Sequence, residues 1–224
     1  MKFGLLMEKA DELGCDLLVT GHYAKVVFEN GRYLLKKAAN HLKDQSYFLY
    51  NLTSEQLSHI RFPLGSYSKK EIREIATELG MVTAEKHDSQ DICFVPDGNY
   101  VDIIANFSKK PQKCGNFVDK SGNILGKHEG IIKYTVGQRK GLGIALGKPM
   151  YVCSKNIDKN EIVLCDDDQL FETTLTAKNF NWIAFDAPPK TFRVKAKIRY
   201  RHEEQPATVT VDKDIVTVVF DQPQ

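Results

Sequence analysis

The stretch DSQDICFVPDG, from Asp88 to Gly98, contains the side chain best suited to covalent chemistry in this 224-residue chain, the thiol of Cys93. A cysteine followed by Phe and Val is more often a small buried hydrophobic residue than a nucleophile. The neighbouring Asp88 and Asp91 would also disfavour the reactive thiolate form. The polar residues before Cys93 and the Pro-Asp-Gly turn after it, however, indicate a junction, where binding sites often form. The residues alone leave both interpretations open.

Other kinds of chemistry have weaker signals. The loop GQRKGLG, Gly137 to Gly143, fits neither the dinucleotide fingerprint nor the Walker pattern, and we interpret it as a basic, flexible loop that could touch a polyanion. The spacings Cys-x-x-Cys and His-x-x-x-His do not occur, so we predict no metal site. The five cysteines are odd in number and form no paired motif, which indicates free thiols in a reducing cytosol.

The composition is that of a soluble globular protein, with 42% hydrophobic and 27% charged residues. We expect no membrane association, because no apolar run approaches the ~20 residues that span a bilayer. The N-terminal sequence MKFGLLMEKADELG does not fit a signal peptide, so we predict a cytoplasmic protein. The net charge of +2 by itself indicates no polyanionic partner.

The segment TFRVKAKIRYR, residues 191–201, has a strongly biased local charge, with only basic charged residues. Its strict alternation predicts a half-buried strand with these two faces: Phe192, Val194, Ala196, Ile198 and Tyr200 on one, and Arg193, Lys195, Lys197, Arg199 and Arg201 on the other. One interpretation is a solvated face that protects an edge strand. The other is a surface for a phosphate backbone. On charge alone we weigh them about equally.

The first hundred residues indicate an α/β arrangement. Apolar residues at helical spacing predict a helix over residues 3–13 that ends at Gly14, and DLLVTG then predicts a short buried strand. Gly21 and His22 follow that strand directly, which is where α/β sheets bind ligands, although an ordinary loop histidine is the simpler interpretation of His22.

Turn and capping signals organise the next segment. Asn30-Gly31 predicts the turn of a hairpin over residues 25–37. Thr53 with Gln56, and Ser68 with Glu71, fit capping boxes. The second box predicts a helix that ends at Gly80, with these residues on its inward face: Ile72, Ile75, Ala76 and Leu79. Between the hairpin and the boxes, a polar loop leads into an aromatic-rich run that we expect to enter the core.

After Gly98 the chain becomes rich in glycine and short alternating segments, which predicts mostly β structure after one short helix over residues 100–107. Two strands around a turn near Lys159 place Cys153 and Cys165 roughly opposite each other, and we expect packed thiols rather than a disulfide. The last strands, in TLTAKNF, FRVKAKIRYR, ATVTV and IVTVVF, predict a small antiparallel barrel or sandwich.

Seven motifs in this order carry a resemblance to a known family: TGHYA, KDQSYFL, FPLG, HDSQDICFVPDG, YTVGQRKGLGI, NWI and KIRYR. They resemble the tRNA-specific 2-thiouridylase (tRNA uridine 2-sulfurtransferase) family, over essentially residues 2–222. Those enzymes use ATP to replace the C2 oxygen of a wobble uridine with sulfur. The resemblance implies a fold of class α/β plus β: part of a PP-loop ATP-pyrophosphatase-type α/β domain (1–98), a small central β domain (99–167) and a C-terminal antiparallel β-barrel (168–224).

The resemblance also implies roles for individual residues. Cys93 matches the cysteine that carries a persulfide, and Gly21 matches a position that approaches the ATP, which would be bound with Mg²⁺. In the implied mechanism ATP adenylates the uridine O2, persulfide sulfur attacks C2, and AMP leaves. The implied partners are the tRNA anticodon stem-loop and a sulfur-relay donor protein or cysteine desulfurase. The following residues match tRNA-contacting positions: His22, Lys43, Asp44, Gln45, Arg199 and Tyr200.

The chain also departs from the family pattern. It contains no Ser-Gly-Gly-x-Asp-Ser phosphate loop and no match to the family's second, resolving cysteine, since Cys15 lies elsewhere. It stops before a Pro-Gly-Gln segment whose glutamine contacts tRNA. We therefore expect a fragment of such an enzyme that cannot adenylate uridine alone. The alternatives are a naturally short tRNA-binding or sulfur-carrier module without ATP chemistry, and a degraded remnant, which the intact motifs make less attractive.

Overall fold

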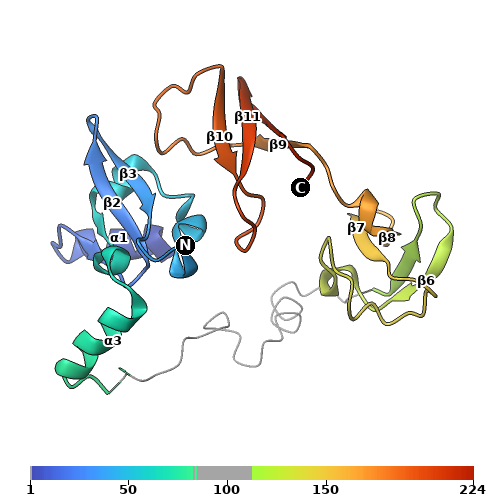
Figure 1. The fold of residues 1–224 in the computed structure, drawn as a ribbon, viewed down its shortest axis with the longest axis horizontal. Helices are drawn as coiled ribbons and strands as arrows, with labels where there is room; N and C mark the ends of the chain where they lie inside the picture. The colour runs from blue at the N-terminus through green and yellow to red at the C-terminus, as the bar shows by residue number, and fades with distance from the viewer. Residues whose placement is uncertain (1, 83, 85–112) are drawn as a thin grey trace. The chain divides into compact units, whose positions relative to one another are not determined.

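The computed structural model describes residues 2–82, 84 and 113–224 (Figure 1). The chain forms two compact units: Met1–Lys86 with Thr174–Gln222, which we call unit 1, and His87–Thr173 with Pro223–Gln224, which we call unit 2. Unit 1 is thus assembled from the two ends of the chain. Cys93 and the helix predicted over residues 100–107 lie outside the described residues.

The N-terminal part of unit 1 mixes short helices and strands, as the sequence predicts. In chain order its elements are α1 (Lys2–Glu12), β1 (Leu18–Val19), β2 (Ala24–Glu29), β3 (Arg32–Lys37), the 3₁₀ helices η1 (His41–Lys43) and η2 (Ser46–Leu49), α2 (Ser54–Ser58), β4 (Ile60–Arg61), η3 (Pro63–Ser66) and α3 (Lys69–Glu78).

Helix α1 ends as predicted at Gly14, which has a φ of +69°. The amide of Gly14 donates to the carbonyl of Asp11, and the amide of Cys15 donates to the carbonyl of Ala10. These two bonds form the glycine-terminated cap that satisfies the last carbonyls of a helix.

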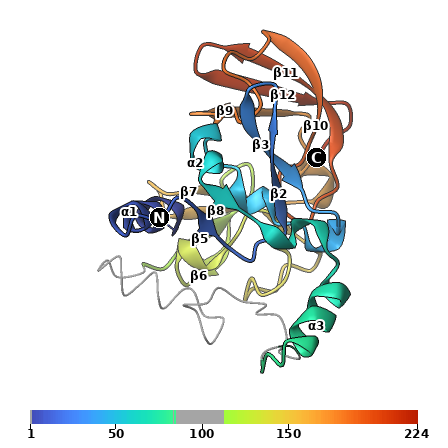
Figure 2. The same ribbon diagram turned by 90° about the vertical axis from the view of Figure 1, so that its left-hand side faces the viewer.

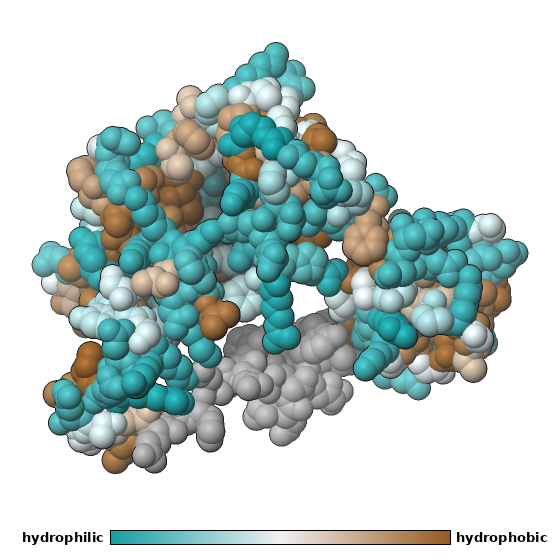
Figure 3. Space-filling view, in the orientation of Figure 1, coloured by the Kyte–Doolittle hydropathy of each residue, from teal (hydrophilic) through white to brown (hydrophobic). Residues whose placement is uncertain are grey.

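Strand β1 lies where predicted and pairs in parallel with β4 in a two-stranded sheet. The prediction that this strand is buried is wrong for the described residues, because Val19 is 58% exposed and its neighbour Leu17 is also exposed. Figure 3 shows apolar areas among hydrophilic ones on one face of the molecule. A strand has two faces, and here only one of them is covered.

The hairpin of β2 and β3 is confirmed, with Glu29 paired to Arg32 across the turn (Figure 1). Asn30 and Gly31 have φ angles of +52° and +78°, which is the two-residue turn that favours Asn-Gly.

Both capping boxes are confirmed, at the start of α2 and of α3. The inward face predicted for α3 is not buried, since Ile75 is 40% and Leu79 is 71% exposed and the helix has no buried residue. The spacing of apolar residues predicts which face is apolar, but not what covers it.

The C-terminal part of unit 1 is an antiparallel sheet of four strands in the order β10-β11-β12-β9 (Figure 2). Its strands are β9 (Thr174–Lys178), β10 (Thr191–Ala196), β11 (Gln205–Asp212) and β12 (Ile215–Phe220). The four predicted strands are therefore confirmed. Among the described residues this sheet does not close into a barrel, because β10 and β9 remain its two edges.

Strand β10 is shorter than predicted. The alternation of exposed and partly buried residues holds from Thr191 to Ala196, and the chain then bends. The amide of His202 donates to the carbonyl of Arg199 in the turn that leads into β11. The prediction that residues 197–201 continue the strand is wrong, and the reason is the packing of Lys197 described below.

Unit 1 has two apolar cores. The first contains Leu49, Leu52, Leu57 and Ile60 from the N-terminal part, with Ile183 packed against it from the C-terminal part. Leu49 and Leu52 of the aromatic-rich run enter this core, as predicted, but Phe48 and Tyr50 of the same run are exposed. The second core lies on one face of the C-terminal sheet and consists of these residues: Ala207, Val209, Val216, Val218 and Phe220.

Unit 2 contains a four-stranded sheet in the order β6-β5-β8-β7, formed by β5 (Gly115–Val118), β6 (Ile124–His128), β7 (Tyr151–Asn156) and β8 (Glu161–Cys165), with β5 and β8 parallel. The short 3₁₀ helices η4 (Ile131–Lys133) and η5 (Asp167–Gln169) lie in its connections. The turn predicted near Lys159 is present, with Asn160 at a φ of +53°.

His128 is a buried polar residue of unit 2, with only 1% of its surface exposed. Its Nδ1 atom accepts a hydrogen bond from the amide of Gly130 at 3.1 Å, and its Nε2 atom lies 3.1 Å from the carbonyl oxygen of Asn160. Since a carbonyl only accepts, this pattern assigns the proton to Nε2 of a neutral ring. Burial lowers the pKa of His128, and the bond to Asn160 opposes this effect.

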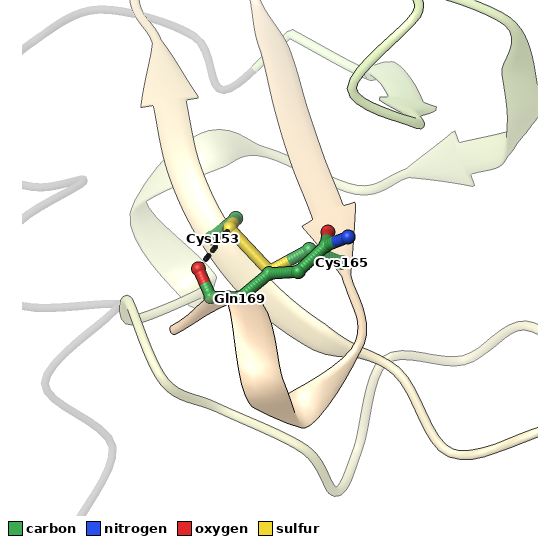
Figure 4. Close-up of a disulfide and its surroundings, with 3 residues drawn as sticks. All are labelled: Cys153, Cys165 and Gln169. Atoms are coloured by element: carbon green, nitrogen blue, oxygen red, sulfur yellow. Dashed lines mark hydrogen bonds between the residues drawn. A yellow bond between two sulfur atoms is a disulfide. The ribbon is translucent and has the colours of Figure 1, made fainter. Parts of the chain in front are cut away.

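Cys153 and Cys165 form a disulfide, so the expectation of packed thiols is wrong (Figure 4). Cys153 lies at a bulge between Val152 and Ser154, where it has no partner in the β7–β8 ladder, and its Cα lies 5.7 Å from that of Cys165, within the range that a disulfide spans. The expectation of free thiols follows from a reducing cellular compartment, whereas the distance between the two cysteines depends only on how β7 and β8 pair. The Cys153 sulfur also lies 3.7 Å from the carbonyl oxygen of Gln169 (Figure 4).

Candidate nucleic-acid interface

The two ends of the chain meet along the segment from Ser46 to Leu52, which contacts the C-terminal part of unit 1 at two places. At one place, the side-chain amide of Asn181 donates to the carbonyls of Tyr50 and Leu52, both at 2.8 Å. At the other, the hydroxyl of Tyr47 donates to the carbonyl of Ile198 at 3.1 Å. The two predicted tRNA-binding stretches, residues 43–45 and 199–200, each adjoin this second contact in sequence.

Three rings and one ammonium group form the second contact, which we call the ring cluster: Tyr47, Phe48, Tyr200 and Lys197. The ring centroid of Tyr200 lies 4.5 Å from that of Phe48 and 6.0 Å from that of Tyr47. The Nζ of Lys197 lies 5.3 Å and 5.7 Å from the ring centroids of Tyr47 and Tyr200, within the range of cation–π attraction. Because Lys197 packs on these rings, the strand predicted to continue through it ends at Ala196.

Of the predicted residues, Lys43 is the last residue of η1, whereas Asp44 and Gln45 lie between η1 and η2 and point into the protein. Asp44 is 6% exposed, and its carboxylate accepts from the amide of Ala38 at 2.8 Å and from the hydroxyl of Ser46 at 2.6 Å. The side chain of Gln45 accepts from the amide of Tyr23 at 2.9 Å. The main chain of Gln45 also donates to the carbonyl of Tyr23 at 2.8 Å.

His22 precedes Tyr23, so the structure brings the TGHYA motif beside the predicted loop. The Nδ1 of His22 lies 2.8 Å from the hydroxyl of Thr20. Its ring packs near those of Phe3 and Phe62, with centroids 5.6 Å and 5.7 Å away. This environment fixes the orientation of the imidazole.

Gly21 lies just after β1, as predicted, and it has no structural need to be glycine. Its φ is not positive, and a Cβ placed there would meet only Leu64 Cδ1, at 3.6 Å, which is an ordinary contact. By contrast, a Cβ at Gly65 would lie 1.8 Å from the carbonyl oxygen of Ala24. The contacts of the described residues therefore give no packing reason for a glycine at position 21.

Part of the basic strand is already paired. Arg193 forms a two-pronged ion pair with Asp221, with N–O distances of 2.7 Å and 2.6 Å. The hydrogen bond from Arg193 lowers the pKa of Asp221. Lys37 likewise donates to Glu204 at 2.6 Å. Arg199 is exposed in the turn next to Tyr200, and Lys195 is exposed on the strand, so exposed basic residues lie both at this turn and along the strand.

The predicted polyanion loop of unit 2 is tied to β7 by two main-chain bonds: Gly137 donates to Val152, and Val152 donates to Gln138. Residues 139–146 and 148–150 line an open hollow of about 720 Å³. Lys148, on its rim, pairs with Asp166 at 2.7 Å.

Sequence reasoning missed the contribution of Tyr47 and Phe48 to this surface, whereas Lys197 belongs to the predicted basic face. The aromatic-rich run after residues 43–45 was the available signal, but it was interpreted only as an entry into the core. In the part of the chain that the structure describes, no cluster of His, Cys, Asp and Glu is arranged to hold a metal ion. Helices in this part are also too short or too polar to cross a membrane.

Comparison with known proteins places these observations in a family. Family models match residues 1–97 (tRNA methyl transferase HUP domain), 105–166 (tRNA methyl transferase PRC-barrel domain) and 172–224 (Aminomethyltransferase beta-barrel domain). Proteins named tRNA-specific 2-thiouridylase MnmA match the whole chain, with 51% identity in Clostridioides difficile, 49% in Acetivibrio thermocellus and 46% in Clostridium acetobutylicum. The chain belongs to the tRNA-specific 2-thiouridylase family.

The chain spans 63% of the length of each of these three 2-thiouridylases. The sequence resemblance to this family is therefore confirmed along the whole chain. The matched models are a HUP domain, a PRC-barrel domain and a beta-barrel domain, in this order, and they agree broadly with the mixed α/β part and the two β-rich parts found here.

Proposed function

We propose that the chain is the greater part of an enzyme that performs ATP-dependent 2-thiolation of the wobble uridine of tRNA, with Cys93 as the persulfide carrier. The supporting observation is that Tyr47 and Phe48, which follow residues 43–45 closely in the sequence, contact Ile198 and Tyr200 from a distant part of the chain. A surface that combines aromatic rings with lysine and arginine is suited to single-stranded RNA. The family membership supplies the reaction.

In this proposal the described residues bind and orient the RNA. Lys43 and Arg199 supply positive charge for phosphates of the anticodon stem-loop. Asp44 and Gln45 act through their hydrogen bonds to Ala38, Ser46 and Tyr23, which fix the loop that carries Lys43. A buried carboxylate that points inward also avoids repulsion with RNA phosphates.

His22 and Tyr200 complete the proposed RNA-binding residues. Gly21 would let the main chain approach ATP, bound with Mg²⁺, because it carries no Cβ. ATP would supply the activation of the uridine oxygen. A sulfur-relay donor protein or a cysteine desulfurase would load Cys93. The division into domains 1–98, 99–167 and 168–224, with a barrel-like last domain, also stays a proposal.

The test separates RNA binding from catalysis. The purified chain is titrated with tRNA at several salt concentrations, and binding that weakens linearly in log–log form with salt is expected. The same chain with ATP, Mg²⁺, a persulfide donor and tRNA is assayed for 2-thiouridine, and none is expected, because the 224 residues contain no phosphate loop of the family type. Formation of 2-thiouridine by the chain alone would contradict the expected inactivity.

The role of Cys93 is tested in a full-length family member that contains this sequence. Cys93→Ser should abolish sulfur transfer while leaving tRNA affinity unchanged. Full activity of that variant would exclude Cys93 as the sulfur carrier.

The alternative is a binding or sulfur-carrier module without ATP chemistry. It predicts salt-sensitive tRNA binding by the chain and no gain of thiolation in any longer protein that contains it. Absence of tRNA binding at low salt would remove this alternative.

A further inference from the structure

Phe48 is a large apolar side chain held at the surface. It is 56% exposed, whereas the adjacent Leu49 is 2% exposed and lies in the core. The Phe48 ring lies 4.5 Å from that of Tyr200, with 42° between the ring planes. A single exposed phenylalanine needs no explanation, so its surroundings decide its significance.

Those surroundings are positively charged. Lys197 Nζ lies over two rings of the cluster, and the same turn exposes Arg199 and Arg201. The turn also carries Glu203, which is exposed, and Glu204, which is bonded to Lys37. The carboxylate of Asp44, at the start of the 44–48 segment, is directed inward. Among the described residues, the turn that carries Tyr200 thus contains three basic residues and two acidic ones, and one of the acidic residues is bonded to Lys37.

A second ring pair in unit 1 provides a comparison. Phe28 and Tyr33 lie 4.9 Å apart, Phe28 is 62% exposed, and Arg61 lies 5.7 Å from the Tyr33 ring. These two residues are direct cross-strand partners in the β2–β3 hairpin, which accounts for their contact. The Phe48–Tyr200 pair joins two distant segments and is not part of a β-ladder.

We propose that Phe48, paired with Tyr200, is a stacking surface for an unpaired base of the bound RNA. This inference rests on the proposed function. An unpaired base offers an aromatic face to the ring, while the phosphates on either side of that base carry the charge that Lys197 and Arg199 attract. Stacking on a phenylalanine ring selects unpaired over paired nucleotides but reads no base identity.

The experiment compares Phe48→Leu with Phe28→Leu in the full 224-residue chain. Leucine keeps an apolar side chain but removes the ring face. Binding is measured to a stem-loop RNA with an unpaired loop and to a fully paired RNA duplex of the same length. A 2-aminopurine base in the loop reports stacking directly, because its fluorescence falls when it stacks on a ring.

Phe48→Leu should weaken binding of the stem-loop by about 5- to 150-fold, the range for loss of one base–aromatic stack. It should leave duplex binding and the salt slope unchanged and should restore 2-aminopurine fluorescence, and Phe48→Trp should keep the stacking. Phe28→Leu should bind like the wild type. Circular dichroism of each variant checks that the fold is kept.

Two results would overturn the inference, and they differ from each other. If the wild type binds the stem-loop and Phe48→Leu binds equally well, only the stacking role is wrong. If the wild type binds no RNA even at low salt, the proposed RNA-binding function of the chain fails, and the stacking role fails with it.

Discussion

Substitution of Asp44 by alanine tests whether the hydrogen bonds of its buried carboxylate fix the conformation of the proposed RNA-binding loop. The carboxylate accepts hydrogen bonds from the amides of Ala38, at 2.8 Å, and Ser46, at 3.4 Å, and from the Ser46 hydroxyl, at 2.6 Å. Alanine removes all three acceptor contacts at once.

The loss of stability expected for Asp44→Ala follows from the burial of the Ala38 amide. Ala38 is 2% exposed, so its amide would be left buried without an acceptor, at a cost of about 1–3 kcal/mol. Loss of the shorter bond from Ser46 adds roughly 1 kcal/mol, because the exposed part of that residue can turn to water. We therefore expect Asp44→Ala to lower the free energy of unfolding of unit 1 by about 2–4 kcal/mol. Asp44→Asn keeps one carbonyl oxygen for Ala38 and should cost about 1 kcal/mol.

Urea unfolding followed by tryptophan fluorescence measures this change. Trp182 is the single tryptophan of the chain and lies in unit 1, among the rings of Phe180, Phe185 and Phe192. Ser46→Ala is the matched control, since it removes only the hydroxyl bond. Hydrogen exchange of the Ala38 amide gives a local measurement, and that amide should lose protection only when Asp44 is replaced.

An unfolding free energy of Asp44→Ala within about 0.5 kcal/mol of the wild type would refute this reasoning. The RNA affinity of the Asp44 variants provides a second measurement. If Asp44 acts by shaping the loop, Asp44→Asn should bind RNA nearly as well as the wild type. A large loss of affinity in a stably folded Asp44→Asn protein would instead indicate direct contact with the RNA.

Three further predictions follow from glycine geometry, protonation and the disulfide. Gly21→Ala should leave the stability of the chain within about 0.5 kcal/mol of the wild type but reduce ATP-dependent thiolation in a full-length protein. Gly65→Ala should destabilise unit 1 severely in a urea titration, because its Cβ would overlap the Ala24 carbonyl. Burial lowers the pKa of His128 in the folded state, so below the ordinary pKa of 6.5 the unfolded state binds more protons than the folded state. The contribution of neutral His128 to stability is therefore full above pH 6.5 and should fall as the pH decreases from 6.5. His128→Phe should flatten this pH profile in thermal melts. Reduction of the Cys153–Cys165 disulfide, which joins residues 12 positions apart, should lower the stability of unit 2 by about 3 kcal/mol, and a melting temperature insensitive to reductant would contradict this.

Local sequence signals predicted the features that depend on a few adjacent residues. The Asn30-Gly31 turn, the two capping boxes and the helix end at Gly14 are such features, and all are confirmed. Each is determined by the conformations that one or two side chains allow.

Features that depend on distant partners were not predictable in this way. Strand β10 ends at Ala196 because Lys197 packs on Tyr47, far away in sequence. The disulfide required a bulge at Cys153, which periodicity does not reveal. Burial of Asp44 depends on its bond to Ala38, and a KDQ sequence in a polar loop gives no sign of it. The placement of Cys93 stays a prediction, since it lies outside the described residues.

Unit 1 is closed by contacts between residues 151 positions apart, such as Tyr47 with Ile198 and Arg32 with Ile183. During synthesis at roughly 5–20 residues per second, about 8–30 s pass between the two members of such a pair. Throughout that interval the first 86 residues have no partner strands from the C-terminal sheet, and Phe48 has no Tyr200 to pack against. The proposed RNA-binding surface therefore cannot form before the C-terminal sheet has been synthesised, so a nascent chain that lacks this sheet should not compete for tRNA.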